Sequence, residues 1–326
     1  MISGPRNEEG AALLSVLLLV AVMSVLALAM SEVAFKSVQR SAAADARSRI
    51  AWQITGAEEA GQLAAEQLNT LTQGALNLQI GVLNTPIVLP ANGGVIEGQL
   101  RDASNCFNLN ALSTQNEEGE VSADTVALYT ALLTALNFSE LEAEALTDAL
   151  IDWMDPDTQP RLAGAEDNYY VGLRPPYRSS GQPLADLTEL RAILGYDQSV
   201  MERLGHLVCV RPSNEPGLFN INTITEREAP LLVMVFSEEF DLPSAERLII
   251  DRPIGGWPNL EPVLTRDEIG RISPELLRTD LIGIRSTYVS FAGTARFDDV
   301  AADFETTYQF RQGEPSGIIR RDYGAR

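Results

Sequence analysis

The chain has very few of the side chains that most enzymes use for chemistry. Of its 326 residues one is histidine, and Lys36 is its only lysine. The single histidine, His206, nearly excludes serine-histidine-aspartate triads, cysteine-histidine pairs and multi-histidine zinc sites. The sequence also lacks the glycine-rich dinucleotide motif, the P-loop, HExxH and GxSxG. The composition therefore disfavours a conventional enzyme.

Positive charge is scarce as well. The chain has 24 basic and 45 acidic residues, a net charge of −21. Nucleic-acid affinity depends on neutralising phosphates, so this charge argues against DNA or RNA as a partner, and equally against anchoring to anionic lipid. Residues 97–170 hold fifteen acidic residues and two arginines. This segment is either a solvated acidic surface or a site for a cation.

The strongest positive signal is a long apolar segment near the N-terminus. Residues 11–30 read AALLSVLLLVAVMSVLALAM and carry no charge. As a helix they would span about 30 Å, enough to cross a bilayer. No proline occurs from Ala11 to Thr85, and the spacing predicts one helix from Ala11 to about Thr72. Its last third is expected to pack on a folded domain through one apolar face made of Ile50, Ile54, Ala57, Gly61, Ala64, Leu68 and Leu71.

Beyond this helix, strand patterns flank a block of helical patterns. Two capping boxes, Ser139 with Glu142 and Asp186 with Glu189, mark helix starts within the block. This order is expected when an all-helical domain is inserted in an α+β domain whose two flanks form one antiparallel sheet against the long helix. Alternating or β-branched residues predict the strands at 86–90, 94–103, 286–297, 304–312 and 316–324.

The N-terminus resembles the type IV pilin-like proteins. A short polar leader, MISGPRNEEG, ends in Gly10, and an uncharged run then begins a long helix. By this resemblance a prepilin peptidase cuts between Gly10 and Ala11. The alternative is a signal anchor that stays intact. Two positions depart from the family pattern: Ala11 stands where phenylalanine is usual, and Ser15, the fifth residue after the cut, where most pilins have glutamate.

The absent glutamate has a physical consequence. In pilins this carboxylate lies in an apolar helical bundle, where an unpaired charge is costly, and it pairs with the N-terminal ammonium of a neighbouring subunit. A subunit with Ser15 cannot form that pair and would suit a terminal position. Lack of this glutamate, together with a helical insertion, resembles the protein K family of type II secretion pseudopilins. The shared short motifs are NLNAL at 108–112, DWMDPD at 152–157, GAEDNYY at 164–170, PPYR at 175–178, LTEL at 187–190 and NINT at 220–223.

This resemblance implies a type IV pilin-like fold with a large inserted helical domain. Within the insertion, the stretch from Phe219 to Leu264 is similar to SAM-like or helix-hairpin-helix modules, although acids surround its hairpin and argue against DNA binding. The implied segments are a leader at 1–10, a transmembrane and filament-core segment at 11–30, the rest of the helix and first strands at 31–105, the inserted domain at 106–279 and the last strands at 280–326.

The resemblance also implies a place and partners. The chain would be a single-pass protein of the inner membrane with its bulk in the periplasm, and would sit at the pseudopilus tip after assembly. Its implied partners are the minor pseudopilins I and J, the major pseudopilin, the prepilin peptidase and the inner-membrane assembly platform.

Two groups of residues could have a chemical role, and the first is the pair of cysteines. Cys106 and Cys209 follow a membrane helix, which suggests the periplasm and a disulfide. Closing a loop of about 100 residues would stabilise the fold by about 4–5 kcal/mol in the chain-entropy model. The alternative is two buried free thiols, because unpaired cysteine is often buried.

The second group consists of the acidic residues in the loop DWMDPDTQPRLAGAEDNYY. Hard oxygen ligands on a flexible loop suit Ca²⁺, and the resemblance implies a structural calcium ion here. The spacing is not that of an EF-hand. The alternative is a solvated loop whose carboxylates cap helix ends. The candidate ligands are Asp152, Asp155, Asp157, Glu166 and Asp167.

Three functions follow from these observations. The first is a minor pseudopilin that helps to initiate pseudopilus assembly for protein secretion across the outer membrane. The second is a membrane-anchored, metal-dependent periplasmic enzyme that uses the acidic loop, and the single histidine weighs against it. The third is a tip pilin of a related type IV pilus, which shares the leader.

Overall fold

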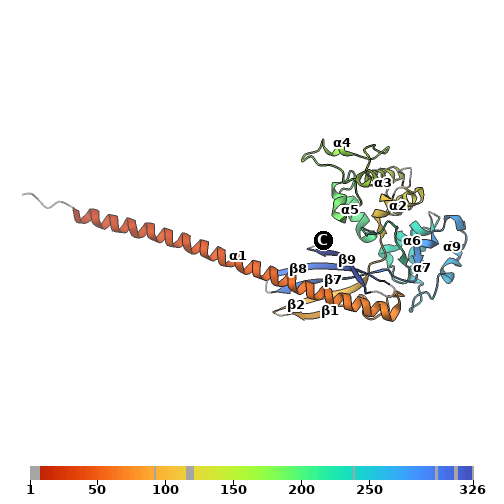
Figure 1. The fold of residues 1–326 in the computed structure, drawn as a ribbon, viewed down its shortest axis with the longest axis horizontal. Coiled ribbons are helices and arrows are strands. Elements are labelled where there is room, and N and C mark those ends of the chain that lie inside the picture. Colours follow the sequence, from red (N-terminus) through yellow and green to blue (C-terminus); the bar gives the residue numbers. More distant parts are fainter. Residues whose placement is uncertain are drawn as a thin grey trace, which may run out of the picture.

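The longest element of the structure is one helix, and the rest of the fold lies at its C-terminal end (Figure 1). In this computed structural model α1 runs from Glu8 to Thr72, a length of about 97 Å at 1.5 Å per residue. Its N-terminal part extends away from the rest of the chain, and its C-terminal third lies against a sheet. The structure describes residues 8–91, 93–114, 121–237, 239–297, 300–311 and 315–324.

The sheet has five strands in the order β1-β2-β7-β8-β9, and all neighbours are antiparallel. The pairing of β2 with β7 joins segments that are nearly 190 residues apart. The predicted antiparallel sheet against a long helix is therefore confirmed. The strands are β1 (Ile87–Ala91), β2 (Gly94–Asp102), β7 (Tyr288–Phe297), β8 (Val300–Gln309) and β9 (Gly317–Tyr323).

The predicted apolar face of α1 forms the core against this sheet, with one error. Ile50, Ile54 and Leu68 are buried there, but Leu71 is 84% exposed. At about 100° per residue, Leu71 is turned away from the centre of the face. Ala65 completes the buried stripe instead.

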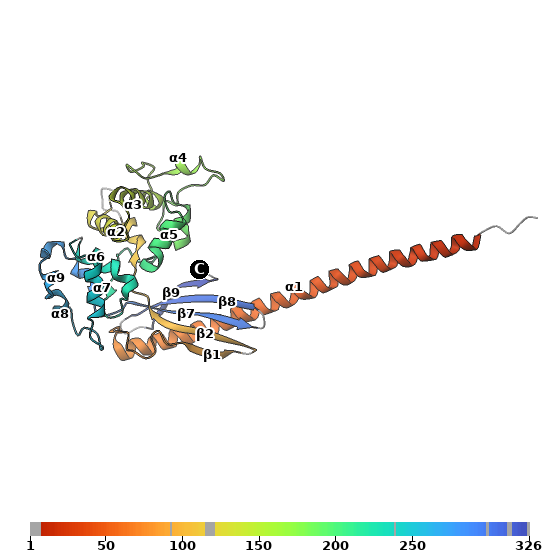
Figure 2. The same ribbon diagram turned by 180° about the vertical axis from the view of Figure 1, so that it is seen from behind.

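Residues between β2 and β7 fold into a separate helical domain with its own hydrophobic core. This domain lies at the C-terminal end of α1, beside one end of the sheet (Figures 1 and 2). Its α-helices are α2 (Ala123–Ala135), α3 (Glu140–Met154), α4 (Asp167–Tyr170), α5 (Gln198–Leu204), α6 (Ala229–Phe236), α7 (Leu242–Ile250), α8 (Glu261–Leu264) and α9 (Asp267–Gly270).

Two small parallel pairs of strands close the helical domain. β3 (Phe107–Asn108) pairs with β4 (Val208–Cys209), and β5 (Phe219–Asn220) pairs with β6 (Ile282–Gly283). Each pair joins the beginning of one helical unit to its end. The two units therefore return to the sheet side, where the chain enters and leaves the domain.

Both predicted capping boxes are present. Ser139 caps α3 together with Glu142, as the sequence predicted. Asp186 also forms a capping box, but the segment that it caps is a short 3₁₀ helix, Leu187–Ala192, and not an α-helix. A capping signature alone cannot distinguish such a short 3₁₀ helix from an α-helix.

Candidate functional site

Three of the five predicted ligands form one carboxylate cluster. Asp152 lies in the last turn of α3, Asp155 caps the end of that helix, and Glu166 precedes α4. One carboxylate oxygen of each lies within 4.8 Å of the others, and all three side chains are buried. Helix α3 and the loop after it thus bring Glu166 to two acids that lie eleven and fourteen positions before it in the sequence.

The cluster has unused acceptor capacity. Asp155 Oδ1 and Glu166 Oε1 are buried and have no hydrogen-bond partner within the described residues. Burial, together with the neighbouring carboxylates, raises the pKa of Asp152 to about 6 and that of Glu166 to about 7. Buried, unpaired and mutually repelling carboxylates are costly unless a cation neutralises them.

The backbone around the cluster is fitted closely to Asp152. The amide of Arg161 donates to Asp152 Oδ2 at 3.0 Å. A Cβ atom on Gly164 would come within 2.0 Å of the same oxygen, so only glycine permits this approach. The sequence showed this glycine but gave no sign of its role, because the approach is a tertiary contact.

The other two predicted ligands lie outside the cluster. Asp167 accepts hydrogen bonds from Arg178 Nη1 and from the backbone and hydroxyl of Ser179. Asp157 is exposed and accepts the backbone amide of Gln159 at 2.7 Å. Both therefore help to shape the loop, and the cluster that could hold an ion is Asp152, Asp155 and Glu166.

The predicted disulfide is present. Cys106 and Cys209 are bonded, with Cα atoms 5.7 Å apart. The bond ties β4 to the residue before β3, at the entrance to the helical domain. Arg211 lies beside it and donates to the carbonyl of Ala103 at 2.6 Å.

The predicted membrane segment forms the free part of α1. Among the described helices, α1 alone is long and apolar enough to cross a membrane, and its most apolar stretch has no buried residues. Ser15 lies on this exposed stretch. The helix begins at Glu8, so Gly10 and Ala11 lie in its first turn, while residues 1–7 of the predicted leader fall outside the described residues.

Comparison with known families identifies the same regions. The family model for type II secretion system protein K matches residues 219–285, and the model of its first domain matches residues 105–213. These two matches coincide with the two helical units that the small strand pairs close. A protein named type II secretion system protein K from Pectobacterium carotovorum is 32% identical over 98% of this chain and 97% of its own length.

The chain belongs to the type II secretion system protein K family. Proteins of the same name from Klebsiella pneumoniae and Aeromonas hydrophila are also 32% identical, over at least 97% of each chain. A chain in the crystal structure of the GspK-GspI-GspJ complex from enterotoxigenic Escherichia coli matches 88% of this chain with a TM-score of 0.75 and 23% identity. The prediction of a minor pseudopilin of type II secretion is confirmed.

Proposed function

We propose that this protein K family member caps the tip of a periplasmic pseudopilus and helps to initiate its assembly. The observation that carries the proposal is the position of the helical domain at the end of α1 opposite the apolar segment (Figure 1). A subunit stacked above would have to pass this domain. Ser15 supports the same position, because it offers no carboxylate to a subunit above.

Location on the filament tests this proposal. Assembled pseudopili would be labelled with gold-coupled antibody against the helical domain. The proposal expects label at one end of each filament, with antibody against the major pseudopilin as the control that labels the whole length. Label from this chain spread along the shaft would contradict it.

The proposed partners are two minor pseudopilins corresponding to I and J, with the major pseudopilin below them. The structural match to a chain of a GspK-GspI-GspJ complex supports the first two. We place the bulk of the chain in the periplasm, which suits its disulfide, and α1 in the inner membrane before assembly. Processing by the prepilin peptidase and docking to the assembly platform complete the proposed route.

We further propose that the helical domain binds Ca²⁺ as a structural ion. Asp152, Asp155 and Glu166 would hold it, since Ca²⁺ takes oxygen ligands and two of these side chains have unpartnered buried oxygens. The ion would hold α3 against the loop that leads to α4.

The α6–α7 pair would serve as a SAM-like packing module, without contacts to nucleic acid.

Thermal unfolding with and without Ca²⁺ tests the metal site. Calcium should raise the Tm of the parent protein, and Glu166→Gln should remove most of that rise. Glu144→Gln, an exposed acid on α3, is the matched control and should leave the rise unchanged. If the parent shows no rise, the metal site is wrong. If secretion is lost in Glu166→Gln while pseudopili still assemble, the metal-dependent enzyme is favoured instead.

A further inference from the structure

The two helical units have the same sequence pattern at their ends. The first unit, closed by β3 and β4, opens with FNLN at 107–110 and ends with LVCVR at 207–211. The second unit, closed by β5 and β6, opens with FNIN at 219–222 and ends with LIGIR at 281–285. In both small strand pairs, the phenylalanine of the opening motif stands opposite the second residue of the closing motif. Matching motifs in the same register indicate two copies of one module.

The first asparagine of each opening motif has the same role in both units. The side-chain oxygens of Asn108 and Asn220 accept the backbone amide two residues later, at 3.3 and 3.0 Å. Their side-chain amides each donate to an oxygen of a serine just beyond the closing motif, Ser213 or Ser286, at 2.7 Å. The units therefore correspond in their hydrogen bonds as well as in their sequence.

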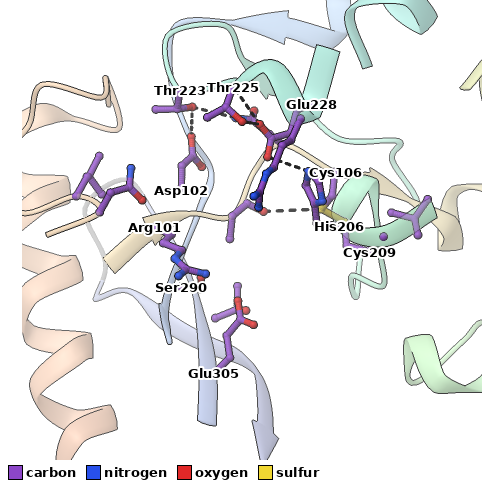
Figure 3. Close-up of a pocket in the computed structure, with 18 of the residues that line it drawn as sticks. Arg101, Asp102, Cys106, His206, Cys209, Thr223, Thr225, Glu228, Ser290 and Glu305 are labelled. Atoms are coloured by element: carbon purple, nitrogen blue, oxygen red, sulfur yellow. Dashed lines mark hydrogen bonds and ion pairs between the residues drawn. A yellow bond between two sulfur atoms is a disulfide. The ribbon is translucent and has the colours of Figure 1, made fainter. Parts of the chain in front are cut away.

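The first unit has two features that the second unit lacks. One is the disulfide shown in Figure 3, since Cys209 stands in the closing motif where the second unit has Gly283. The other is a long loop. Helices α3 and α7 each end at a capping aspartate, Asp155 and Asp251. The loop after Asp155, residues 156–185, is more than three times as long as the loop at 252–260 that leads from Asp251 to α8.

In the second unit an arginine neutralises the capping aspartate. Arg266, which follows α8, forms an ion pair with Asp251. The pair is partly exposed and joins positions fifteen residues apart. It therefore ties the end of α7 to the segment beyond α8 with a charge that belongs to the chain itself.

The first unit has no such pair at its capping aspartate. In the described part of the helical domain, neither Asp155 nor Glu166 forms an ion pair, and each has a buried oxygen without a partner. The basic group that reaches their cluster is Arg161, whose Nε lies 3.8 Å from Asp152 Oδ1. One arginine therefore faces three buried carboxylates, and the cluster keeps an excess of negative charge.

We propose that a bound Ca²⁺ does in the first unit what Arg266 does in the second unit. The proposal rests on the calcium site proposed above and adds that the ion serves one copy of the module only. The second unit is held by a charge of its own chain, and the first unit by a charge taken from solution. The helical domain thus combines a calcium-dependent and a calcium-independent copy of the same module.

Loss of the ion should loosen the long loop of the first unit. The loop has a small aromatic core of its own, in which the ring of Tyr170 lies 5.2 Å from that of Trp153 and 5.3 Å from that of Tyr177. Leu162 and Val171 on the same loop are exposed. Little apolar area therefore holds the loop once the carboxylates at its base repel one another.

Hydrogen exchange of the full chain in detergent micelles, with Ca²⁺ or with a calcium chelator, tests the proposal. Without Ca²⁺, amides of residues 156–185 should exchange on the order of tenfold faster, and those of residues 242–270 should be unchanged. Faster exchange in both units would overturn the proposal and leave the calcium site in place. No change in either unit would overturn the calcium site as well.

A variant of the second unit tests the correspondence from the other side. Arg266→Met should speed exchange in residues 242–270 by about fivefold, as expected on the loss of a partly exposed ion pair, and Ca²⁺ should not reverse it. Arg271→Met changes an exposed arginine of the same unit and is the matched control, which should exchange as the parent does. Parent-like exchange in Arg266→Met, or its recovery on adding Ca²⁺, would contradict the role given to Arg266.

Discussion

At the residue scale, the acidic loop shows what its sequence could and could not predict. The density of acids near the end of a helix pointed to a cation site. The choice among the five candidates could not be made, because it depends on which side chains turn inward. The carboxylate of Asp167 instead accepts hydrogen bonds from Arg178 and Ser179, which lie more than ten positions further along the chain. Glu166, which has no such competitor for one oxygen, completes the cluster.

Calcium affinity is expected to increase as pH rises through about 6–7, because protons compete with the ion for Asp152 and Glu166. For the metal-free chain, the stability of the fold changes with pH in the opposite direction. A raised pKa in the folded state gives stability that is present at low pH and is lost as pH rises through about 6–7. Calcium titrations at a pH of about 5.5 and about 7.5 measure the competition. Equal affinity at both pH values would exclude these carboxylates as ligands.

At the scale of elements, one buried acid fixes α1 on the sheet. Glu58 is 3% exposed and accepts hydrogen bonds from Thr306, Arg321 and Tyr323, on β8 and β9. Its backbone carbonyl also accepts the hydroxyl of Tyr308 at 2.8 Å. The helix is therefore held in one register against the two last strands of the chain.

Removing this contact should loosen the helix from the sheet. Glu58→Ala leaves three donors unpaired and should lower the free energy of unfolding by about 2–3 kcal/mol. Glu59→Ala, the next residue on the exposed side, should change it by less than about 0.5 kcal/mol. Urea unfolding of the full chain in detergent measures both variants. Equal midpoints for the two would show that Glu58 has no anchoring role.

The disulfide acts between elements, at the neck of the helical domain. The bond closes a loop of 103 residues. Replacing both cysteines with alanine should therefore cost about 2–5 kcal/mol of unfolding free energy. The oxidised parent, the reduced parent and the double variant are compared by denaturant unfolding. The last two should coincide at a lower midpoint, and three equal midpoints would contradict the expected contribution.

Long elements were predictable, whereas short tertiary ones were not. Helix α1 and strands β7 to β9 have enough residues to show their period in the sequence. The strand pairs β3–β4 and β5–β6 have two residues per strand and join positions far apart, so no local pattern marks them. Leu71 was placed in the core because the pattern could not show where the buried face of α1 ends.

At the scale of the whole molecule, the structure combines a long apolar helical segment, a small α+β domain and a helical domain placed between two strands of its sheet. The order of strand and helix patterns was enough to predict this arrangement. The cavity between the sheet and the helical domain (Figure 3) was not predictable, since its walls come from parts of the chain as far apart as Leu78 and Asp322. Much of the net charge of −21 lies on the helical domain, away from the apolar segment at residues 11–30.

The central claim is that the chain enters a pseudopilus as a processed subunit, and its N-terminus tests this most directly. The full chain would be produced with and without its prepilin peptidase and its intact mass measured. The account predicts a mature protein that starts at Ala11 only when the peptidase is present, and no processing of Gly10→Val. A parent chain that keeps Met1 in the presence of active peptidase, so that Gly10→Val changes nothing, would contradict it.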